Sequence, residues 1–212
     1  MDIAIFTFNP FAENTYILYD ESKKCVIFDP GCSNPEEQQQ LTDFIESNKL
    51  TPVKLINTHC HIDHVLGNKF VSDNYNLPLT SHKGESGVLD MQPQVSTMYG
   101  IPYDPSPKIT IFLDDGDIVT FGNTILKVFF TPGHSPASIS FYNEEHGVVI
   151  GGDVLFQGSI GRTDLPGGDF ETLSKSIREK LYVLPDDVVV YSGHGPSTTI
   201  GIEKRTNPFV KL

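Results

Sequence analysis

The stretch "NTHCHIDHVLGN", residues 57–68, places His59, His61, Asp63 and His64 within six consecutive positions. The apolar run "PVKLINT" just before the first histidine predicts a strand. Side chains two residues apart in an extended backbone point the same way, so the first two histidines can bind one metal ion together. Imidazole and carboxylate groups are ligands that divalent metals such as zinc prefer. The stretch therefore predicts a metal site rather than a run of surface histidines.

Three more residues of the same chemical kind follow apolar runs and glycine turns. They are His134 in "TPGHSPAS", Asp153 in "VVIGGDVLF" and His194 in "VVVYSGHGP". Each apolar run predicts a strand, and a strand end is a rigid platform where glycine lets the backbone come close. The pattern suggests one site assembled from several strand ends.

The number of candidate ligands indicates how many ions the site would hold. One four-coordinate ion that keeps an open position needs only three protein ligands. Two ions that share a carboxylate, about 3.5–4 Å apart, can use more and can hold a hydroxide between them. The candidate set of seven is His59, His61, Asp63, His64, His134, Asp153 and His194.

The bulk composition narrows the class of protein. The chain has 212 residues, is 38% hydrophobic and carries a net charge of −12, which favours one globular domain over residues 1–212. An acidic chain repels phosphate backbones, so we expect no nucleic acid partner. We also expect no membrane association and a cytoplasmic location, because we find no export signal, no long apolar run and no paired cysteine framework among Cys25, Cys32 and Cys60.

Strands and helices are predicted in mixed order, which is typical of an α/β protein with sheets inside and helices outside. Residues 33–50 form an amphipathic helix in which Pro35 suits the first position and Asn34 or Ser33 could be the cap. Residues 98–108 form a long loop of the kind that is often functional. The expected strands lie near 3–8, 15–20, 24–31, 52–58, 109–113, 117–122, 125–133, 137–143, 147–153 and 187–195, and further helices near 65–75, 81–92 and 170–184.

The segments "THCHIDH", "TPGH", "GGD" and "SGHG", in this order, resemble the metallo-β-lactamase superfamily. The resemblance implies a four-layer αβ/βα sandwich with the site at one edge of two facing sheets. It implies that His59, His61 and His134 hold one metal ion, that Asp63, His64 and His194 hold a second, and that Asp153 bridges them. We expect two divalent ions, zinc first, with iron or manganese as alternatives.

Within that superfamily the chain is most similar to glyoxalase II-like hydrolases. Asp153 and the segment "GSIGRTDLPGGD", residues 158–169, carry this resemblance. Full glyoxalase II has an additional C-terminal helical domain that helps to hold glutathione. This chain ends soon after His194, so we expect that clamp to be absent or replaced.

The resemblance implies a metal-dependent hydrolase that cleaves a thioester of a small thiol. A hydroxide held between the ions would attack the carbonyl, and the thiolate would leave easily. Asp63 is the candidate catalytic residue, since it could orient the hydroxide as well as bind metal. The alternative is a mononuclear iron persulfide dioxygenase that uses only His59, His134 and Asp153. A nuclease and a metal-binding protein without turnover are less favoured.

Residues outside the ligand set have weaker indications. Arg162 is the candidate substrate-binding residue, because arginine pairs bidentately with the carboxylates of small-thiol conjugates. Tyr99 and Tyr103 could form a pocket wall or simply pack.

Asp29 in "FDPG" could orient a histidine or form a turn. Cys60, between two ligands that share an orientation, should point away from the metal. His82 and His146 match no strand-end pattern and are expected to have surface or packing roles.

Overall fold

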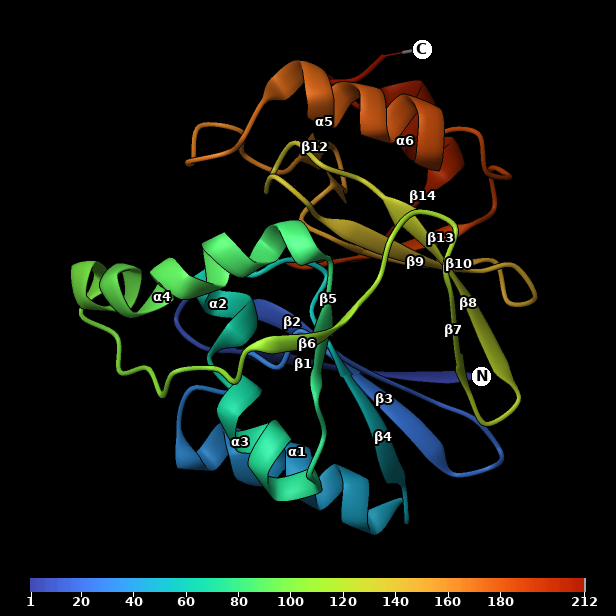
Figure 1. Cartoon of the computed structure of the whole chain (residues 1–212). Coiled ribbons are helices and arrows are strands. Elements are labelled where there is room, and N and C mark those ends of the chain that lie inside the picture. The colour runs from blue at the N-terminus through green and yellow to red at the C-terminus, as the bar shows by residue number, and fades with distance from the viewer. Residues whose placement is uncertain (212) are drawn as a thin grey trace. The chain divides into compact units, whose positions relative to one another are not determined.

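The computed structural model describes residues 1–211 and divides into two compact units (Figure 1). The first unit contains residues 1–112 and 120–124, and the second contains residues 113–119 and the chain from 125 onward. Two six-stranded sheets and several helices form the framework. The predicted α/β class is confirmed.

The first sheet has its strands in chain order: β1 (Asp2–Phe8), β2 (Glu13–Tyr19), β3 (Lys24–Phe28), β4 (Thr51–Ile56), β5 (Leu79–Ser81) and β6 (Ile109–Phe112). The first three strands are antiparallel, and β3 to β6 run parallel to one another. The helices of this unit are α1 (Pro35–Ser47), α2 (Ile62–Val65), α3 (Asn68–Tyr75) and α4 (Ser86–Tyr99), with a 3₁₀ turn, Lys83–Glu85, before α4.

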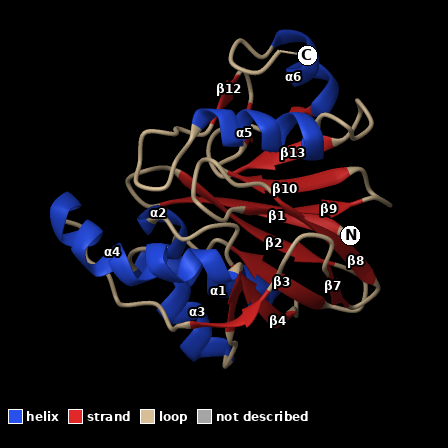
Figure 2. Cartoon of the chain, turned by 45° about the horizontal axis from the view of Figure 1, so that its top comes forward, coloured by secondary structure: helices blue, strands red, loops and turns tan. Residues whose placement is uncertain are grey.

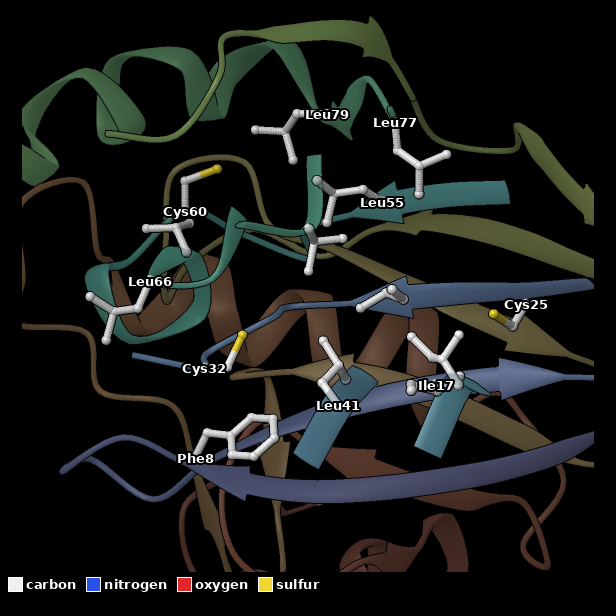
Figure 3. Packing of buried hydrophobic residues seen from close by; sticks show 14 of the residues in the cluster. Phe8, Ile17, Cys25, Cys32, Leu41, Leu55, Cys60, Leu66, Leu77 and Leu79 are labelled. Atoms are coloured by element: carbon white, nitrogen blue, oxygen red, sulfur yellow. The ribbon is translucent and has the colours of Figure 1, made fainter. Parts of the chain in front are cut away.

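Helix α1 begins where the sequence predicts. The Asn34 side chain caps it by accepting the Glu37 N–H at 3.0 Å, and Pro35 occupies the first position. On its inner face Leu41 is fully buried in a cluster with Ile17 of β2 and Leu55 of β4 (Figure 3). A buried leucine of this kind contributes about 2–5 kcal/mol to stability relative to alanine, so this face anchors α1 on the sheet.

The single helix predicted over residues 65–75 is wrong in extent, because the structure has two short helices there. α2 ends at Val65 and α3 begins at Asn68. Between them the Gly67 N–H donates to the Pro30 carbonyl at 2.7 Å, and a Cβ on Gly67 would lie 2.4 Å from Cys32 Sγ. The helix breaks because the chain must pack tightly on the segment after β3.

The second sheet has the order β14 (Thr198–Thr199), β13 (Val189–Ser192), β10 (Val148–Gly152), β9 (Ile139–Asn143), β8 (Thr124–Phe130) and β7 (Ile118–Phe121). β10 and β13 are parallel neighbours, and β8 to β10 alternate in direction. A small hairpin joins β11 (Leu155–Phe156) to β12 (Ser159–Ile160).

Two helices lie on one face of the second sheet: α5 (Phe170–Ser176), which continues into a π-helical turn at Ile177–Leu181, and α6 (Ile200–Thr206) (Figures 1 and 2). The sequence predicts the first but not the second. No helix within residues 1–211 is long and apolar enough to cross a membrane.

A buried carboxylate holds residues 120–124 within the first unit. Asp20, 3% exposed, accepts hydrogen bonds from the Asn123 N–H at 2.7 Å, the Thr124 hydroxyl at 3.0 Å, and the Ser22 N–H and hydroxyl. Burial opposes ionisation, but these hydrogen bonds outweigh it and hold the pKa of Asp20 below its usual value. The ionised form therefore stabilises the folded state.

We predict that Asp20→Asn lowers the free energy of unfolding by about 1–3 kcal/mol at pH 7, because the variant leaves buried donors poorly matched. The folded-state pKa of Asp20 is depressed, so its contribution is complete above about pH 4 and is lost as the pH falls. Urea denaturation between pH 7 and pH 3 measures this. Asp90→Asn, at an exposed site on α4, is the control. An Asp20→Asn deficit that stays constant with pH contradicts the prediction.

Candidate metal centre

Strand direction brings the first group of predicted ligands together. β3 and β4 are parallel neighbours, so the segments after them, at Asp29 and at residues 57–64, leave the sheet at the same edge. His59 and His64 are fully buried there, with ring centroids 4.1 Å apart. The His61 ring lies 4.8 Å from that of His59. The three imidazoles of the opening motif thus form one cluster in the first unit.

A chain of hydrogen bonds sets the tautomers of two histidines. The Thr58 hydroxyl donates to Asp29 Oδ2 at 2.6 Å, so its oxygen accepts from His59 Nδ1 at 3.1 Å. His64 Nδ1 donates to the same Asp29 oxygen at 3.1 Å. Each ring therefore carries its proton on Nδ1 and its lone pair on Nε2, which is the arrangement of a metal ligand whose other nitrogen is held by a second partner.

Asp29 is thus an orienting carboxylate. Of the two roles that its sequence position allows, orienting a histidine or forming a turn, the hydrogen bonds favour the first. Its Oδ1 also accepts the Thr58 N–H at 2.7 Å and the Asn57 amide at 3.3 Å. The backbone of Asp29 has φ 47°, a left-handed conformation that costs energy for a residue other than glycine. The hydrogen bonds to its side chain hold it there.

Glu13 of β2 is a further buried acid beside this cluster. It is fully buried, accepts the Thr15 hydroxyl at 3.0 Å, and lies 3.9 Å from His64 Nδ1. Burial raises the pKa of Glu13 well above its usual value, and the nearby His64 only partly offsets this. The sequence does not indicate Glu13, because one acid at the start of a strand carries no pattern.

The second group of predicted ligands gathers at one edge of the second sheet. β10 and β13 are parallel and end at Asp153 and His194, and the Gly193 N–H donates to the Gly152 carbonyl at 2.9 Å. β8 runs in the same direction as β10 and leads to His134. Asp153 Oδ2 lies 3.5 Å from His134 Nε2 and 3.6 Å from His194 Nε2. One carboxylate oxygen therefore faces both imidazoles.

These separations fit shared metal coordination. When two ligand atoms bind the same tetrahedral ion at about 2.1 Å, they lie about 3.4 Å apart. The two heavy atoms of a direct hydrogen bond lie closer together than this. Both Asp153 distances are close to that value, and so is the 3.6 Å between His64 Nε2 and Asp63 Oδ2 in the first unit. The donor set and its spacing fit divalent metal.

The loop after β12 supports the second group through its backbone. His134 Nδ1 donates to the Arg162 carbonyl at 2.8 Å, which leaves the lone pair on Nε2. A Cβ on Gly161 would lie 1.9 Å from the Asp153 carbonyl oxygen and 3.0 Å from the His134 ring. Only glycine fits between the two ligands, so the Gly-Arg segment orients His134 with its main chain.

The Arg162 side chain forms an ion pair on the same loop. Its guanidinium donates to Asp164 through Nε and Nη2, both at 2.7 Å. Asp164 is not among the residues predicted from the sequence, although the spacing Arg-x-Asp is a signal that could have indicated it.

The other residues singled out in the sequence lie as follows. The Cys60 thiol is buried among apolar side chains (Figure 3), and burial raises its pKa well above the usual value; that Cys60 takes no part in metal binding stays a prediction. Tyr99 packs edge-on against Phe11, and the Tyr103 hydroxyl bonds Ser106. His82 accepts the Gly84 N–H and His146 contacts Asn143, which are local structural roles as predicted.

We predict that Asp29→Asn weakens zinc binding about 10–100-fold, because the amide can no longer accept from both Thr58 and His64. Competition with a chromophoric chelator measures the affinity. Asp43→Asn, at an exposed carboxylate of α1 in the same unit, should leave it unchanged. Equal zinc affinity in the Asp29 and Asp43 variants would argue against an orienting role.

We predict that Gly161→Ala lowers the free energy of unfolding by about 1–3 kcal/mol and weakens metal binding, because the added methyl group collides with the backbone behind Asp153. Thermal unfolding and metal titration measure the two effects. Gly87→Ala is the matched control, since a Cβ there meets nothing within 4 Å. A Gly161→Ala protein that behaves like Gly87→Ala would show that the loop is not tightly packed.

Comparison with known proteins identifies the family. The family model of the metallo-beta-lactamase superfamily matches residues 8–194. The hydroxyacylglutathione hydrolase GloC of Haemophilus influenzae is 37% identical, with 99% of this chain and 98% of GloC covered. The crystal structure of BLEG-1 B3 metallo-beta-lactamase has a TM-score of 0.90 at 38% identity, with all of both chains covered. TTHA1623, in a di-iron-bound form, has a TM-score of 0.88 at 34% identity, covering 98% of this chain and all of that one.

The match covers the whole of both ligand groups and most of the chain. The predicted fold is therefore confirmed, and the chain belongs to the metallo-β-lactamase superfamily.

Proposed function

We propose that this chain is a metal-dependent hydrolase that cleaves a thioester of a small thiol, and that its two ligand groups form one dinuclear centre. The observation that carries the proposal is the position of Asp153, whose Oδ2 lies at nearly the same distance from His134 Nε2 and His194 Nε2. A carboxylate so placed is suited to bridge two ions. In this arrangement His59, His61 and His134 would hold one ion, and Asp63, His64 and His194 would hold the other.

The choice of substrate rests on the relatives. GloC, which is described as a hydroxyacylglutathione hydrolase, matches nearly the full length of this chain. That likeness supports a thioester of a small thiol over other esters. BLEG-1, described as a B3 metallo-beta-lactamase, makes a β-lactam the natural counter-substrate in any assay.

The metal is proposed to be zinc, with iron or manganese as alternatives. The imidazole and carboxylate donors accept all three, and the di-iron form of TTHA1623 supports iron as the first of the alternatives. When bound, two such ions supply a water-derived nucleophile at neutral pH and polarise the substrate carbonyl.

The residues of the chain orient the attacking water and hold the histidine ligands in the correct tautomer. We assign to Asp63, whose Oδ2 lies 3.6 Å from His64 Nε2, the role of accepting a hydrogen bond from the attacking water and so orienting it. Asp29 and Thr58 keep His59 and His64 in the ligand tautomer. The thiolate of a thioester leaves without a general acid, and this reaction therefore needs no further titrating residue.

A mononuclear iron persulfide dioxygenase is the second candidate. It would use His59, His134 and Asp153. The di-iron form of TTHA1623 favours iron as the metal, whereas its two ions fit a dinuclear centre. The remaining ligand-type residues, such as the fully buried His64 held by Asp29, would then have no use.

A cytoplasmic location remains part of the proposal. Cys25, Cys32 and Cys60 are free and buried, which supports a reducing compartment. The acidic charge supports a small-molecule substrate rather than nucleic acid.

Metal content and hydrolysis, measured on one sample purified without added metal, test the proposal. We expect about two zinc ions per chain and cleavage of S-lactoylglutathione that stops with a chelator and returns with zinc. Asp63→Asn should lower kcat by about 10²–10⁴-fold, while Asp43→Asn should leave it unchanged. One iron per chain, with oxygen uptake on glutathione persulfide and no thioester cleavage, would favour the dioxygenase. Cleavage of a β-lactam in preference to the thioester would contradict the proposed substrate.

A further inference from the structure

The loop between β12 and α5 carries a carboxylate-binding group that is already occupied by a carboxylate of the same chain. Arg162 Nε and Nη2 donate to Asp164 Oδ1 and Oδ2, each at 2.7 Å. This two-bond geometry is how an arginine binds a free carboxylate. Asp164 thus occupies the Arg162 guanidinium in the way that a ligand would.

The pair is exposed and can therefore exchange. The side chains are 57% and 68% exposed, and an ion pair in water contributes little because solvent replaces it readily. The hydrogen bonds from Arg162 lower the pKa of Asp164 to about 2, so the aspartate is ionised throughout the neutral range. An incoming carboxylate would therefore compete with an ionised Asp164 that the Arg162 guanidinium holds only weakly.

The position of the pair links it to the candidate metal centre. The carbonyl of Arg162 accepts from His134 Nδ1, and Gly161 packs on the His134 ring. The main chain of Arg162 is therefore held against a proposed ligand, while its side chain extends into solvent. A carboxylate bound by this guanidinium therefore lies no farther from the His134 ligand group than the length of one arginine side chain.

We propose that Arg162 binds a carboxylate of the substrate and that Asp164 is an internal competitor for it, so that the pair sets the selectivity for acidic small-thiol conjugates. This inference rests on the proposed function for the identity of the substrate. Asp164 is then a specificity-determining residue: it occupies the guanidinium when no acidic ligand is bound and is displaced when one arrives. Neutral thioesters, which cannot displace it, gain nothing from Arg162.

Equilibrium binding tests the proposal without turnover. The probes are S-methylglutathione, which has two free carboxylates, and its dimethyl ester, which has none. Isothermal titration gives Kd for both probes with the wild type, Asp164→Asn, Arg162→Gln and the double variant. Asp187→Asn, which removes the same charge from an exposed site in the same unit, is the control for general electrostatics.

We expect Asp164→Asn to bind the acidic probe about two- to sixfold more tightly, the gain from removing a competitor of surface ion-pair strength. Its Kd for the dimethyl ester should not change. Arg162→Gln should lose the preference for the acid, and Asp164→Asn should then have no effect in the double variant. With S-lactoylglutathione, Asp164→Asn should lower KM by the same factor and leave kcat unchanged.

Several results overturn the proposal. One is that Asp164→Asn binds the acidic probe no more tightly than the wild type, and another is that the affinity for the dimethyl ester, or the affinity of Asp187→Asn for the acid, rises by the same factor. A third is that Asp164→Asn still has its effect when Arg162 is replaced. A fourth is that no protein in the series distinguishes the acid from the ester. Absence of thioester cleavage in all variants bears on the proposed function alone, because the binding measurements do not need turnover.

Discussion

The carboxylate of Asp29 is the interaction on which the first half of the candidate centre depends. It lies at the end of β3, beside the end of the parallel strand β4, and accepts from the Thr58 N–H, the Thr58 hydroxyl and His64. A buried charge is costly unless it is paired, so these donors and the carboxylate need one another. Because the Thr58 hydroxyl in turn accepts from His59, one group sets the tautomers of two histidines. The positive φ of Asp29 is the backbone cost of placing the carboxylate there.

The second half reaches the same result by different means. His134 is oriented by a main-chain carbonyl, that of Arg162, and the approach of that carbonyl requires a residue without a side chain at Gly161. A carbonyl carries no net charge and only accepts hydrogen bonds, so it holds the Nδ1–H of His134 without burying a charge beside it. The first half uses the carboxylate of Asp29 for the same purpose.

The sequence predicts the features that rest on residue type and periodicity. The seven candidate ligands, the longer strands and the start of α1 at Pro35 all follow from motif, alternation or capping. What the sequence does not predict depends on contacts between distant segments. The break at Gly67 exists because of Pro30 and Cys32, and the role of Glu13 depends on its distance to His64. Three strands have only two residues each, which is too short to show an alternation of apolar and polar side chains: β11, β12 and β14.

The three buried cysteines determine how readily the thiols of this chain react with other molecules. Burial raises the pKa values of Cys25 and Cys32 to about 12 and raises that of Cys60 well above its usual value. At neutral pH only about one in 10⁵ of the first two would be thiolate, and the thiolate is the form that attacks disulfides and electrophiles. Oxidised low-molecular-weight thiols therefore find almost no reactive thiolate among these cysteines. The packing of the first unit therefore protects Cys25, Cys32 and Cys60 from forming mixed disulfides with oxidised small thiols.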